Sequence, residues 1–388
     1  MANSMLKQLR LQNFKCYNDT PVDFSNLTVF SGANGAGKST IIQALLLFRQ
    51  IVYSGYYHYT TPTVNLNGSL VYLGNSFDVL NKWHPEKKEC YFTINTPRNK
   101  KIELGLQAID GKEICRRMNL LTPCEIDKAQ KDKNHINLFN DFFIYLSAER
   151  IGPRISFDVP NEWPRINFIG NNGENSAYQL SQIANIPVKQ QYNSFLKHLK
   201  GDDEDIENIL NYLQKCYSIL GKEIEINPIY FEYPEKVSLD FSIIDKETKV
   251  HKSFRPLNVG FGLTYTLPIF ISLIYASTFN DIMVIIENPE AHLHPKGQVA
   301  IGRMIAWAAA AGIQVIIETH SDHVLNGIRL AVKNKEIRPE EVQLNFIVND
   351  DNEDGAKIVS PKIMSDGMID KWPEGFFDEF DKTLAELF

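Results

Sequence analysis

The sequence lacks the features that mark membrane and secreted proteins. No apolar run reaches about 18 residues, the length that a membrane-spanning helix needs. Residues 1–5 do not begin a basic stretch followed by an apolar one, as a signal peptide does. The five cysteines lie far apart in the 388-residue chain and form no C-x-x-C pair, which disfavours a disulfide frame and favours reduced thiols. We therefore expect a cytoplasmic protein without a membrane partner.

The chain also lacks an excess of basic charge. Its net charge of −7 does not favour a protein coated in nucleic acid, although a local basic groove stays compatible with it. Short basic clusters occur at 98–101, 116–117 and 128–133, where polar and acidic residues interrupt them, so we interpret them as solvated surface. No internal repeat, low-complexity tract or sustained heptad pattern is present, which excludes a long coiled-coil arm.

The most informative segment is 32–40, which fits the phosphate-loop pattern G-x-x-x-x-G-K-[ST]. Residues 27–31 before it read as a buried strand and 41–48 after it as a buried helix, a context that disfavours a chance glycine-rich turn. Backbone N–H groups and the dipole at a helix N-terminus favour phosphate there. Lys38 would reach the β- and γ-phosphates, and Ser39 would hold Mg²⁺. The predicted nucleotide-binding residues of this segment are Asn34, Gly35, Ala36, Gly37, Lys38, Ser39 and Thr40.

The pattern of apolar residues changes along the chain. Residues 5–14 read as a strand, followed by a turn at 18–21 and a second strand. From 175 to 220 the pattern is helical, and segment 201–205 gives an acidic start to the helix predicted at 206–220. Apolar, β-branched runs at 281–286 and 313–317 flank a helical stretch, which predicts a βαβ unit in a parallel sheet. Further on, two strands joined by an acidic turn are predicted at 342–348 and 356–363.

Polar residues follow these apolar strands at the positions where a phosphate loop needs its second acid. Glu287 ends the first strand and is followed by N-P-E-A-H-L-H-P, while E-T-H-S-D-H follows the second at 318–323. A glycine-bearing segment, 257–262, precedes a predicted helix.

The order of these motifs resembles the ABC-type ATPase heads of the SMC, RecF and OLD families, and most closely an OLD-like subgroup. Segment 9–17 is similar to the opening of RecF-like heads, and 145–154 and 372–377 resemble marks of a stand-alone branch without a Toprim nuclease domain. The implied fold is α/β, a P-loop ABC-type ATPase head with mixed sheets, a helical insertion and a small C-terminal α+β region. The expected segments are an N-terminal lobe at 1–174, an insertion at 175–226, a C-terminal lobe at 227–338, and a hairpin and tail at 339–388.

The resemblance also implies a mechanism with ATP and Mg²⁺ as cofactors. Two heads pair face to face and sandwich two ATP molecules, so a homodimer is expected, from which higher oligomers could be built. Glu287 would coordinate Mg²⁺ together with Ser39, and His320 would sense the γ-phosphate. Asn258, Gly260 and Gly262 would contact the γ-phosphate bound to the other subunit.

Two positions depart from the family pattern. Asn258 stands where such heads carry a serine, and Asn288 stands where they carry the carboxylate that orients the attacking water. An amide can position water but cannot take its proton, so we expect slow hydrolysis unless Glu290 or another acid compensates. The usual Q-loop glutamine stays unassigned, because 66–73 contains none.

Three groups of residues leave alternatives open. His292, His294, His320 and His323 could form a zinc site, although switch and packing roles are preferred because no cysteine or further cluster supports a metal. Glu149, Arg150 and Arg154 could form a structural ion pair or contact nucleotide or partner. The C-terminal apolar stripe favours packing on the head over binding a partner, and it comprises Phe376, Phe377, Phe380, Leu384 and Leu387.

The function we expect is that of a nucleic-acid-associated ATPase, acting in phage defence or DNA repair, with double-stranded DNA as a candidate partner. Residues 324–388 contain one acidic turn, which makes a fused Toprim nuclease unlikely and points to a separate, nuclease-like effector. The alternative is an ATP-dependent scaffold or sensor with little hydrolysis and no direct DNA binding. A transporter ATPase subunit is a weaker third hypothesis, because the opening resembles RecF and the Q-loop glutamine is missing.

Overall fold

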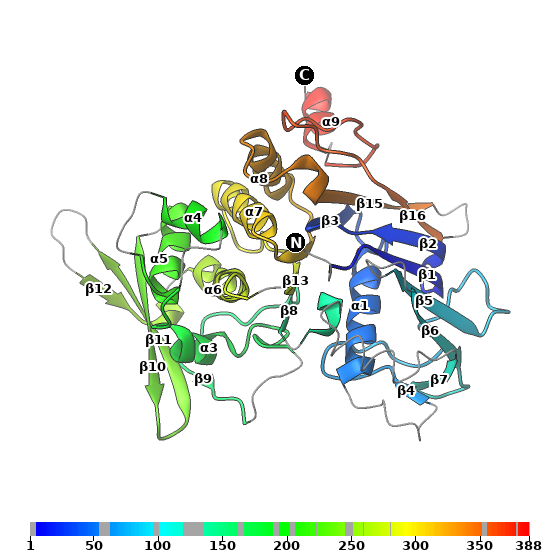
Figure 1. Ribbon diagram of the computed structural model, residues 1–388, viewed down its shortest axis with the longest axis horizontal. Coiled ribbons are helices and arrows are strands. Elements are labelled where there is room, and N and C mark those ends of the chain that lie inside the picture. Colours follow the sequence, from blue (N-terminus) through cyan, green and yellow to red (C-terminus); the bar gives the residue numbers. More distant parts are fainter. Residues whose placement is uncertain are drawn as a thin grey trace. The chain divides into compact units, whose positions relative to one another are not determined.

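The computed structural model describes residues 5–53, 63–95, 101–118, 136–140, 142–161, 167–188, 194–201, 206–221, 223–244, 251–258, 260–279, 281–350, 355–377 and 379–387. The chain forms two compact units (Figure 1). Unit 1 comprises Met1–Phe143, Pro339–Met364 and Ile369–Phe388, and unit 2 comprises Ile144–Arg338 and Ser365–Met368.

Unit 1 contains an antiparallel sheet with the strand order β2-β1-β5-β6-β7-β4. Alternate residues such as Leu9 and Leu11 are fully buried, as expected for a sheet with one face on a core. The strands are β1 (Gln8–Phe14), β2 (Tyr17–Asp23), β4 (Thr63–Asn65), β5 (Glu89–Asn95), β6 (Lys101–Ala108) and β7 (Ile114–Met118).

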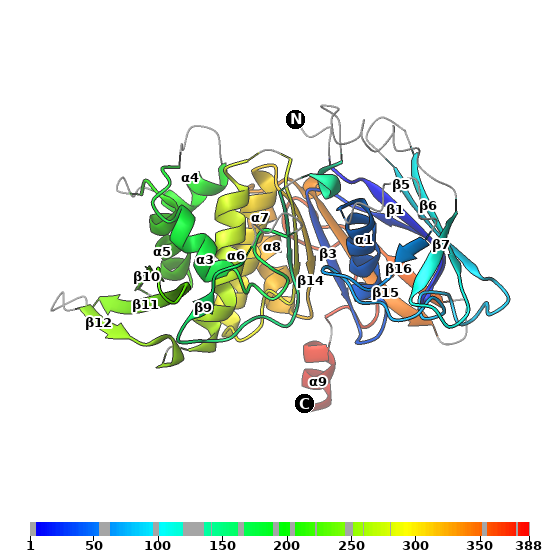
Figure 2. The same ribbon diagram turned by 90° about the horizontal axis from the view of Figure 1, so that it is seen from below.

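A second group of strands in unit 1 leads into the phosphate loop. Strand β3 (Leu27–Gly32) pairs in parallel with β15 (Val342–Asp350), which pairs antiparallel with β16 (Gly355–Val359). Helix α1 (Lys38–Tyr53) follows the loop and lies beside β3 in both views (Figures 1 and 2). The strand, loop and helix order that the motif requires is thus present, and the predicted C-terminal hairpin is confirmed.

The C-terminal apolar stripe is only partly packed. Phe376 is buried in unit 1 and contacts the ring of Phe346, with centroids 5.2 Å apart. Helix α9 (Glu379–Leu387) leaves Leu384 and Leu387 exposed, and the side chain of Phe380 lies outside the described residues. The packing interpretation holds for Phe376 and not for the two leucines.

Unit 2 contains the predicted βαβ unit. Strands β13 (Met283–Glu287) and β14 (Gln314–Glu318) are parallel, with Glu287 opposite Glu318, and α7 (Pro295–Ala310) connects them. Strand β8 (Phe143–Leu146) lies on the other side of β13. Because Val, Ile and Met residues fill both strands and are buried, the sheet is covered on both faces. Two polar segments therefore leave the same edge of the sheet, at Glu287 and at Glu318.

Helices α7 and α8 (Asp322–Lys333) lie side by side in Figures 1 and 2 because glycines let their backbones approach. A Cβ on Gly302 would collide with the carbonyl oxygen of Val324, and one on Gly327 would collide with that of Val299. Ser321 caps α8 by accepting a hydrogen bond from the Val324 N–H at 3.2 Å. The cap and the close crossing fix the segment between Glu318 and α8.

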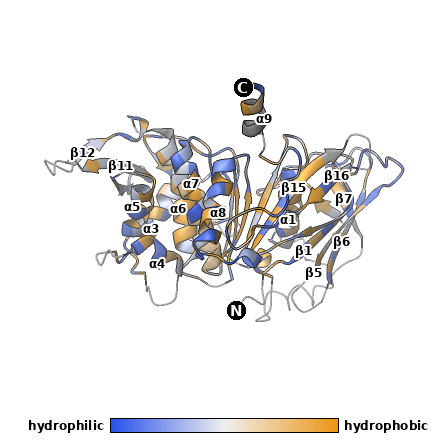
Figure 3. Cartoon of the chain, turned by 90° about the horizontal axis from the view of Figure 1, so that it is seen from above, coloured by the Kyte–Doolittle hydropathy of each residue, from blue (hydrophilic) through white to orange (hydrophobic). Residues whose placement is uncertain are grey.

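The rest of unit 2 is a helical layer and a small sheet. Strand β11 pairs antiparallel with β9, β10 and β12. Figure 3 shows hydrophobic residues within the helices and strands. Among the described residues, no helix has the length and hydrophobicity needed to cross a membrane. The elements are α3 (Ser176–Ile183), α4 (Ser194–Lys200), α5 (Ile209–Ile219), α6 (Phe261–Ala276), β9 (Phe157–Asp158), β10 (Ile224–Phe231), β11 (Lys236–Ile244) and β12 (His251–Phe254).

Two local predictions are wrong. The turn expected at 18–21 lies instead between Phe14 and Tyr17, which pair with each other across the β1–β2 hairpin. Helix α5 does not have an acidic start at 201–205, of which 202–205 lie outside the described residues. It begins at Ile209, and the side chain of Asn208 caps it by accepting from the Asn211 N–H at 2.9 Å. A single Asn cap satisfies a free N–H directly, which acidic residues several positions earlier do not.

Candidate functional site

The phosphate loop in unit 1 has a backbone shape that only its glycines allow. Gly35 and Gly37 have φ angles of +76° and +115°, a region that residues with a Cβ rarely adopt. A Cβ on Gly37 would also lie 2.5 Å from the Sγ of Cys16. The hydroxyl of Tyr17 donates to the Gly37 carbonyl at 3.0 Å, so the β1–β2 hairpin supports the loop from one side.

Lys38 is folded over this loop. Its ammonium group donates to the carbonyls of Gly32 at 3.1 Å and Ala33 at 2.9 Å, and only 3% of the residue is exposed. Asn34, Gly35 and Ser39 are exposed. The arrangement places one cation and the N-terminus of α1 around an open backbone loop, a site suited to phosphate oxygens.

In unit 2, Glu287 ends β13 with its carboxylate held by two donors from one segment. The Tyr145 hydroxyl donates to one oxygen at 3.0 Å and the Ala148 N–H to the other at 3.2 Å. Burial raises the pKa of Glu287 above its usual value, although these hydrogen bonds and the nearby charge of Arg150 oppose the shift. A partly buried carboxylate of this kind is a good oxygen ligand for a divalent cation.

Arg150 contacts the backbone at the end of β13 and the start of the loop that follows it. Its guanidinium donates to the carbonyls of Ser147 at 3.1 Å, Glu287 at 2.6 Å and Asn288 at 2.5 Å. Burial lowers the pKa of this side chain to about 10, because the charged form loses its hydration. Of the alternatives left open for Arg150, the contacts favour a structural role, with backbone carbonyls in place of an ion-pair partner.

Asn288 has a φ of +44°, in the left-handed region. Asn tolerates this conformation better than most residues with a side chain. Its N–H donates to the carbonyl of Glu318 at 2.8 Å and its own carbonyl accepts from Arg150. Both backbone groups of this residue are therefore hydrogen-bonded, its N–H to the Glu318 backbone and its carbonyl to the Arg150 side chain.

Glu290 is engaged with the segment that follows β14. One carboxylate oxygen accepts from the Thr319 hydroxyl at 2.8 Å, and the other accepts from the His320 N–H at 2.9 Å. Thr319 is fully buried, whereas His320 is exposed. The structure thus brings three of the predicted site residues of unit 2 together at one sheet edge, namely Glu287, Asn288 and Glu290, with His320 beside them.

The glycine-bearing segment 257–262, called the signature segment below, packs together with the start of α6 against the loop that follows β13. Gly260 caps α6, and a Cβ on Gly262 would lie 2.8 Å from the carbonyl oxygen of His292. The ring of Tyr265, one turn along α6, lies 4.3 Å from the His292 ring. Close packing at Gly262 explains why this position needs a glycine, apart from any ligand.

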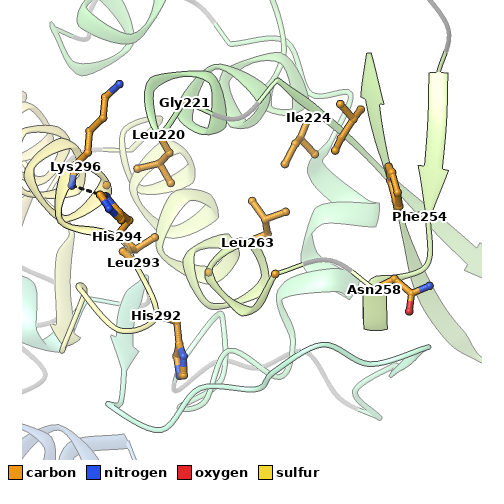
Figure 4. Close-up of a pocket in the computed structure, with 14 residues that line it drawn as sticks. Leu220, Gly221, Ile224, Phe254, Asn258, Leu263, His292, Leu293, His294 and Lys296 are labelled. Carbon is orange, nitrogen blue, oxygen red and sulfur yellow. Dashed lines mark hydrogen bonds between the residues drawn. The ribbon is translucent and has the colours of Figure 1, made fainter. Parts of the chain in front are cut away.

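An open pocket of about 680 Å³ borders this segment (Figure 4). Asn258, Gly260 and Gly262 line it on one side and the loop from His292 to Gly297 on the other. Among the described residues that line the pocket, none is acidic, and the N-termini of α6 and α7 both reach it. Its apolar wall includes Leu220, Ile224, Phe254, Leu263 and Leu293.

The four histidines do not gather into a metal site. Within the part of the chain that the structure describes, no cluster of three or more His, Cys, Asp or Glu side chains could hold an ion. His294 instead caps α7 by accepting from the Lys296 N–H at 3.4 Å, and the side chain of His323 lies 3.7 Å from Asp322. The contacts of His294 and His323 are thus those of a helix cap and a neighbouring side chain.

The contacts of segment 145–150 were not predicted. The segment was singled out as a family mark, and its Glu149 and Arg150 as an ion pair or as contacts to nucleotide or partner. Instead, Tyr145, Ala148 and Arg150 contact Glu287 and Asn288, about 140 positions away. The sequence signal that could have indicated this role is a charged Arg in an apolar context just before Pro153.

Comparisons with known proteins identify the family. The model of the family described as AAA ATPase domain matches residues 5–251 and 167–325, and that of a protein family of unknown function, DUF3696, matches 337–387. A comparison with curated proteins finds no match.

Solved structures similar to this chain include three SMC heads. One is the Smc head bound to the C-winged helix domain of ScpA, at 14% identity and a TM-score of 0.49, covering 92% of this chain and 98% of that one. The SMC head domain from Thermotoga maritima is 13% identical with a TM-score of 0.43 at the same coverage. The Smc head with an extended coiled coil, bound to the C-terminal domain of ScpA derived from Pyrococcus furiosus, is 13% identical with a TM-score of 0.47 and covers 99% of both chains.

The match to the ATPase family model extends over most of the chain and includes the phosphate loop, the glycine-bearing segment and both strand ends of unit 2. The chain therefore belongs to the AAA ATPase domain family, which confirms the predicted α/β ATPase head.

Proposed function

We propose that this protein is an ABC-type ATPase head that binds Mg-ATP, pairs with a second copy on binding it, and hydrolyses it slowly. The observation that carries the proposal is the phosphate loop, where Lys38 and the start of α1 surround a backbone that Gly35 and Gly37 keep open. A bound nucleotide would replace the Gly32 and Ala33 carbonyls as partners of the Lys38 ammonium group.

The residues present fit a magnesium ion. Mg²⁺ prefers oxygen ligands and keeps several waters. Ser39 is an exposed residue at the start of α1 and carries a hydroxyl, and Glu287 has a carboxylate that Tyr145 and Ala148 hold in one orientation. When bound, Mg²⁺ would neutralise charge on the β- and γ-phosphates. Tyr145 and Ala148 would keep the Glu287 carboxylate from turning away.

The signature segment supports pairing of two copies. Asn258, Gly260 and Gly262 border an open pocket without acidic lining among the described residues, where two helix N-termini meet. Such a surface favours an anionic group, and one chain carries one copy of each motif. We infer that the γ-phosphate bound by one subunit reaches this segment of the other, and that His320 senses the γ-phosphate.

Slow hydrolysis follows from Asn288. Its amide can orient a water molecule but cannot accept the proton as a carboxylate would. The left-handed backbone and the two flanking hydrogen bonds hold this residue in place, so ordered water positioning would be retained while proton transfer is lost.

This slow turnover leaves two functions to compare. The first is a nucleic-acid-associated ATPase that acts with a separate nuclease-like effector on double-stranded DNA, in phage defence or DNA repair. The second is an ATP-dependent scaffold or sensor, which the amide at position 288 favours, because assembly would then follow ATP binding and hydrolysis would serve as a timer.

Light scattering with and without ATP, combined with duplex-DNA binding at two salt concentrations, separates these functions. An ATP-dependent dimer that binds DNA in a salt-sensitive way supports the first function. An ATP-dependent dimer without DNA affinity supports the second. A protein that stays monomeric with ATP and binds no nucleotide refutes both, and Lys38→Ala provides the matched control without the phosphate-loop cation.

A further inference from the structure

Glu290 connects two loops that leave neighbouring parallel strands. Its two carboxylate oxygens accept separately from the Thr319 hydroxyl at 2.8 Å and the His320 N–H at 2.9 Å. Both donors belong to the segment after β14, whereas Glu290 belongs to the loop after β13. One carboxylate therefore cross-links the loop of Asn288 to the segment of the switch histidine.

A second set of hydrogen bonds reinforces this link. The Ser321 N–H donates to the Thr319 hydroxyl oxygen at 3.1 Å, and the Ser321 hydroxyl donates to Oε1 of Gln298 on α7 at 2.6 Å. The amide of Gln298 in turn donates to the Leu293 carbonyl at 2.9 Å, back in the loop after β13. The two loops are thus joined a second time, through Gln298 of α7.

The loop after β13 also contacts α6, called the signature helix here because it follows the signature segment 257–262. The carbonyl of His292 packs against Gly262, and the His292 ring contacts Tyr265. A displacement of the switch segment would pass through Glu290 and this loop to the N-terminus of α6. Packed interiors transmit such shifts because they have little free space.

We propose that Glu290 is a positioning residue that couples the switch His320 to the loop of Asn288 and the signature helix, and that it is not the general base that replaces the missing carboxylate. This inference rests on the proposed ATPase function. The two oxygens of Glu290 accept from two donors of the segment after β14, which turns the carboxylate toward that segment. A positioning role uses these acceptors, whereas a base needs a carboxylate directed at the attacking water.

The variants Glu290→Gln and Glu290→Ala distinguish the two roles. A glutamine can still accept from the His320 N–H through its carbonyl and donate to the Thr319 hydroxyl through its amide. We expect Ala to lower kcat by about 10–100-fold, the loss that follows a misplacement of about 1 Å. Gln should restore kcat to within about fivefold of the wild type and leave the pH–rate profile unchanged.

A general base gives a different result. Gln and Ala would then both lower kcat by about 10²–10⁴-fold, and the acidic limb of the pH–rate profile would disappear in both. That outcome overturns the proposal. The matched controls are Thr319→Val, which removes the hydroxyl and should resemble Glu290→Ala, and Thr319→Ser, which keeps it and should resemble Glu290→Gln.

The hydrogen bonds of Glu290 can also be tested without ATP hydrolysis. If the wild type releases phosphate no faster than Lys38→Ala, the ATPase proposal fails, and the tie is tested by unfolding Glu290→Ala, Thr319→Val and the double variant in urea. If Glu290 and Thr319 are hydrogen-bonded, the stability losses of Glu290→Ala and Thr319→Val should not add up in the double variant. Additive losses would contradict it.

Discussion

Arg150 offers the sharpest test of how the loop of Asn288 is held. The guanidinium is almost completely buried and donates to the carbonyls of Ser147, Glu287 and Asn288. Each hydrogen bond from a charged donor contributes about 1.5–3 kcal/mol. Against this stands the cost of removing the charge from water, which lowers the pKa of this arginine to about 10.

The variant Arg150→Met removes the charge together with its desolvation cost. It also takes this donor from the carbonyls of Ser147 and Glu287, whereas the Asn288 carbonyl keeps the Ala291 N–H at 3.1 Å. Each buried, unsatisfied group costs about 1–3 kcal/mol, and water can satisfy some of them. We expect a net loss of about 2–4 kcal/mol in the free energy of unfolding, which lowers the melting temperature by about 5–15 °C in a unit of this size.

Urea unfolding and thermal melting measure this loss, and phosphate release measures the effect on turnover. Arg150→Lys should be intermediate, because one ammonium group cannot span the carbonyls that the planar guanidinium bridges. The control is Arg154→Met, at an exposed position, which should change stability by no more than about 0.5 kcal/mol. If Arg150→Met melts and turns over like the wild type, the assigned role of Arg150 is wrong.

Three further predictions concern the loop and its support. Burial raises the pKa of Glu287, so the folded protein loses stability as the pH rises through that raised pKa and the carboxylate becomes charged. We therefore expect Glu287→Gln to increase the free energy of unfolding of the metal-free protein in urea at neutral pH. This gain should vanish in acid, where the Glu287 side chain of the wild type is neutral. Asn288→Asp should increase phosphate release, since Asp restores a carboxylate and tolerates the left-handed backbone, whereas Asn288→Glu should lose about 1–2 kcal/mol of stability through strain. An unchanged rate in both would show that position 288 does not limit hydrolysis. Gly302→Ala should cost about 1–3 kcal/mol because its Cβ meets the Val324 carbonyl, whereas Gly297→Ala, with neighbours at 3.6 Å or more, should gain up to about 1 kcal/mol; equal melting temperatures would contradict the close α7–α8 crossing.

The features that could be predicted from the sequence are those with a local cause. The phosphate loop, the βαβ unit around α7 and the C-terminal hairpin each depend on short patterns of apolar residues, glycines and turns, and the structure contains all of them. The positions of Glu287 and His320 could also be predicted. Each follows an apolar strand, and parallel strands bring their carboxyl ends to one edge of the sheet.

Contacts between distant residues could not be predicted in this way. Tyr145 and Arg150 reach Glu287 and Asn288 through the packing of β8 beside β13, and neither periodicity nor spacing encodes that arrangement. The bonds of Glu290 to Thr319 and His320 likewise depend on the register of β13 against β14. The start of α5 at Ile209 could not be predicted, because several residues before it could cap a helix and the path of the chain selects Asn208.

Phosphate release from Mg-ATP, measured for the wild type and for Lys38→Ala with and without duplex DNA, tests the central claim most directly. We expect slow release that depends on Lys38, and a further increase with DNA if the protein acts on nucleic acid. Release by the wild type no faster than by Lys38→Ala, under either condition, would contradict it.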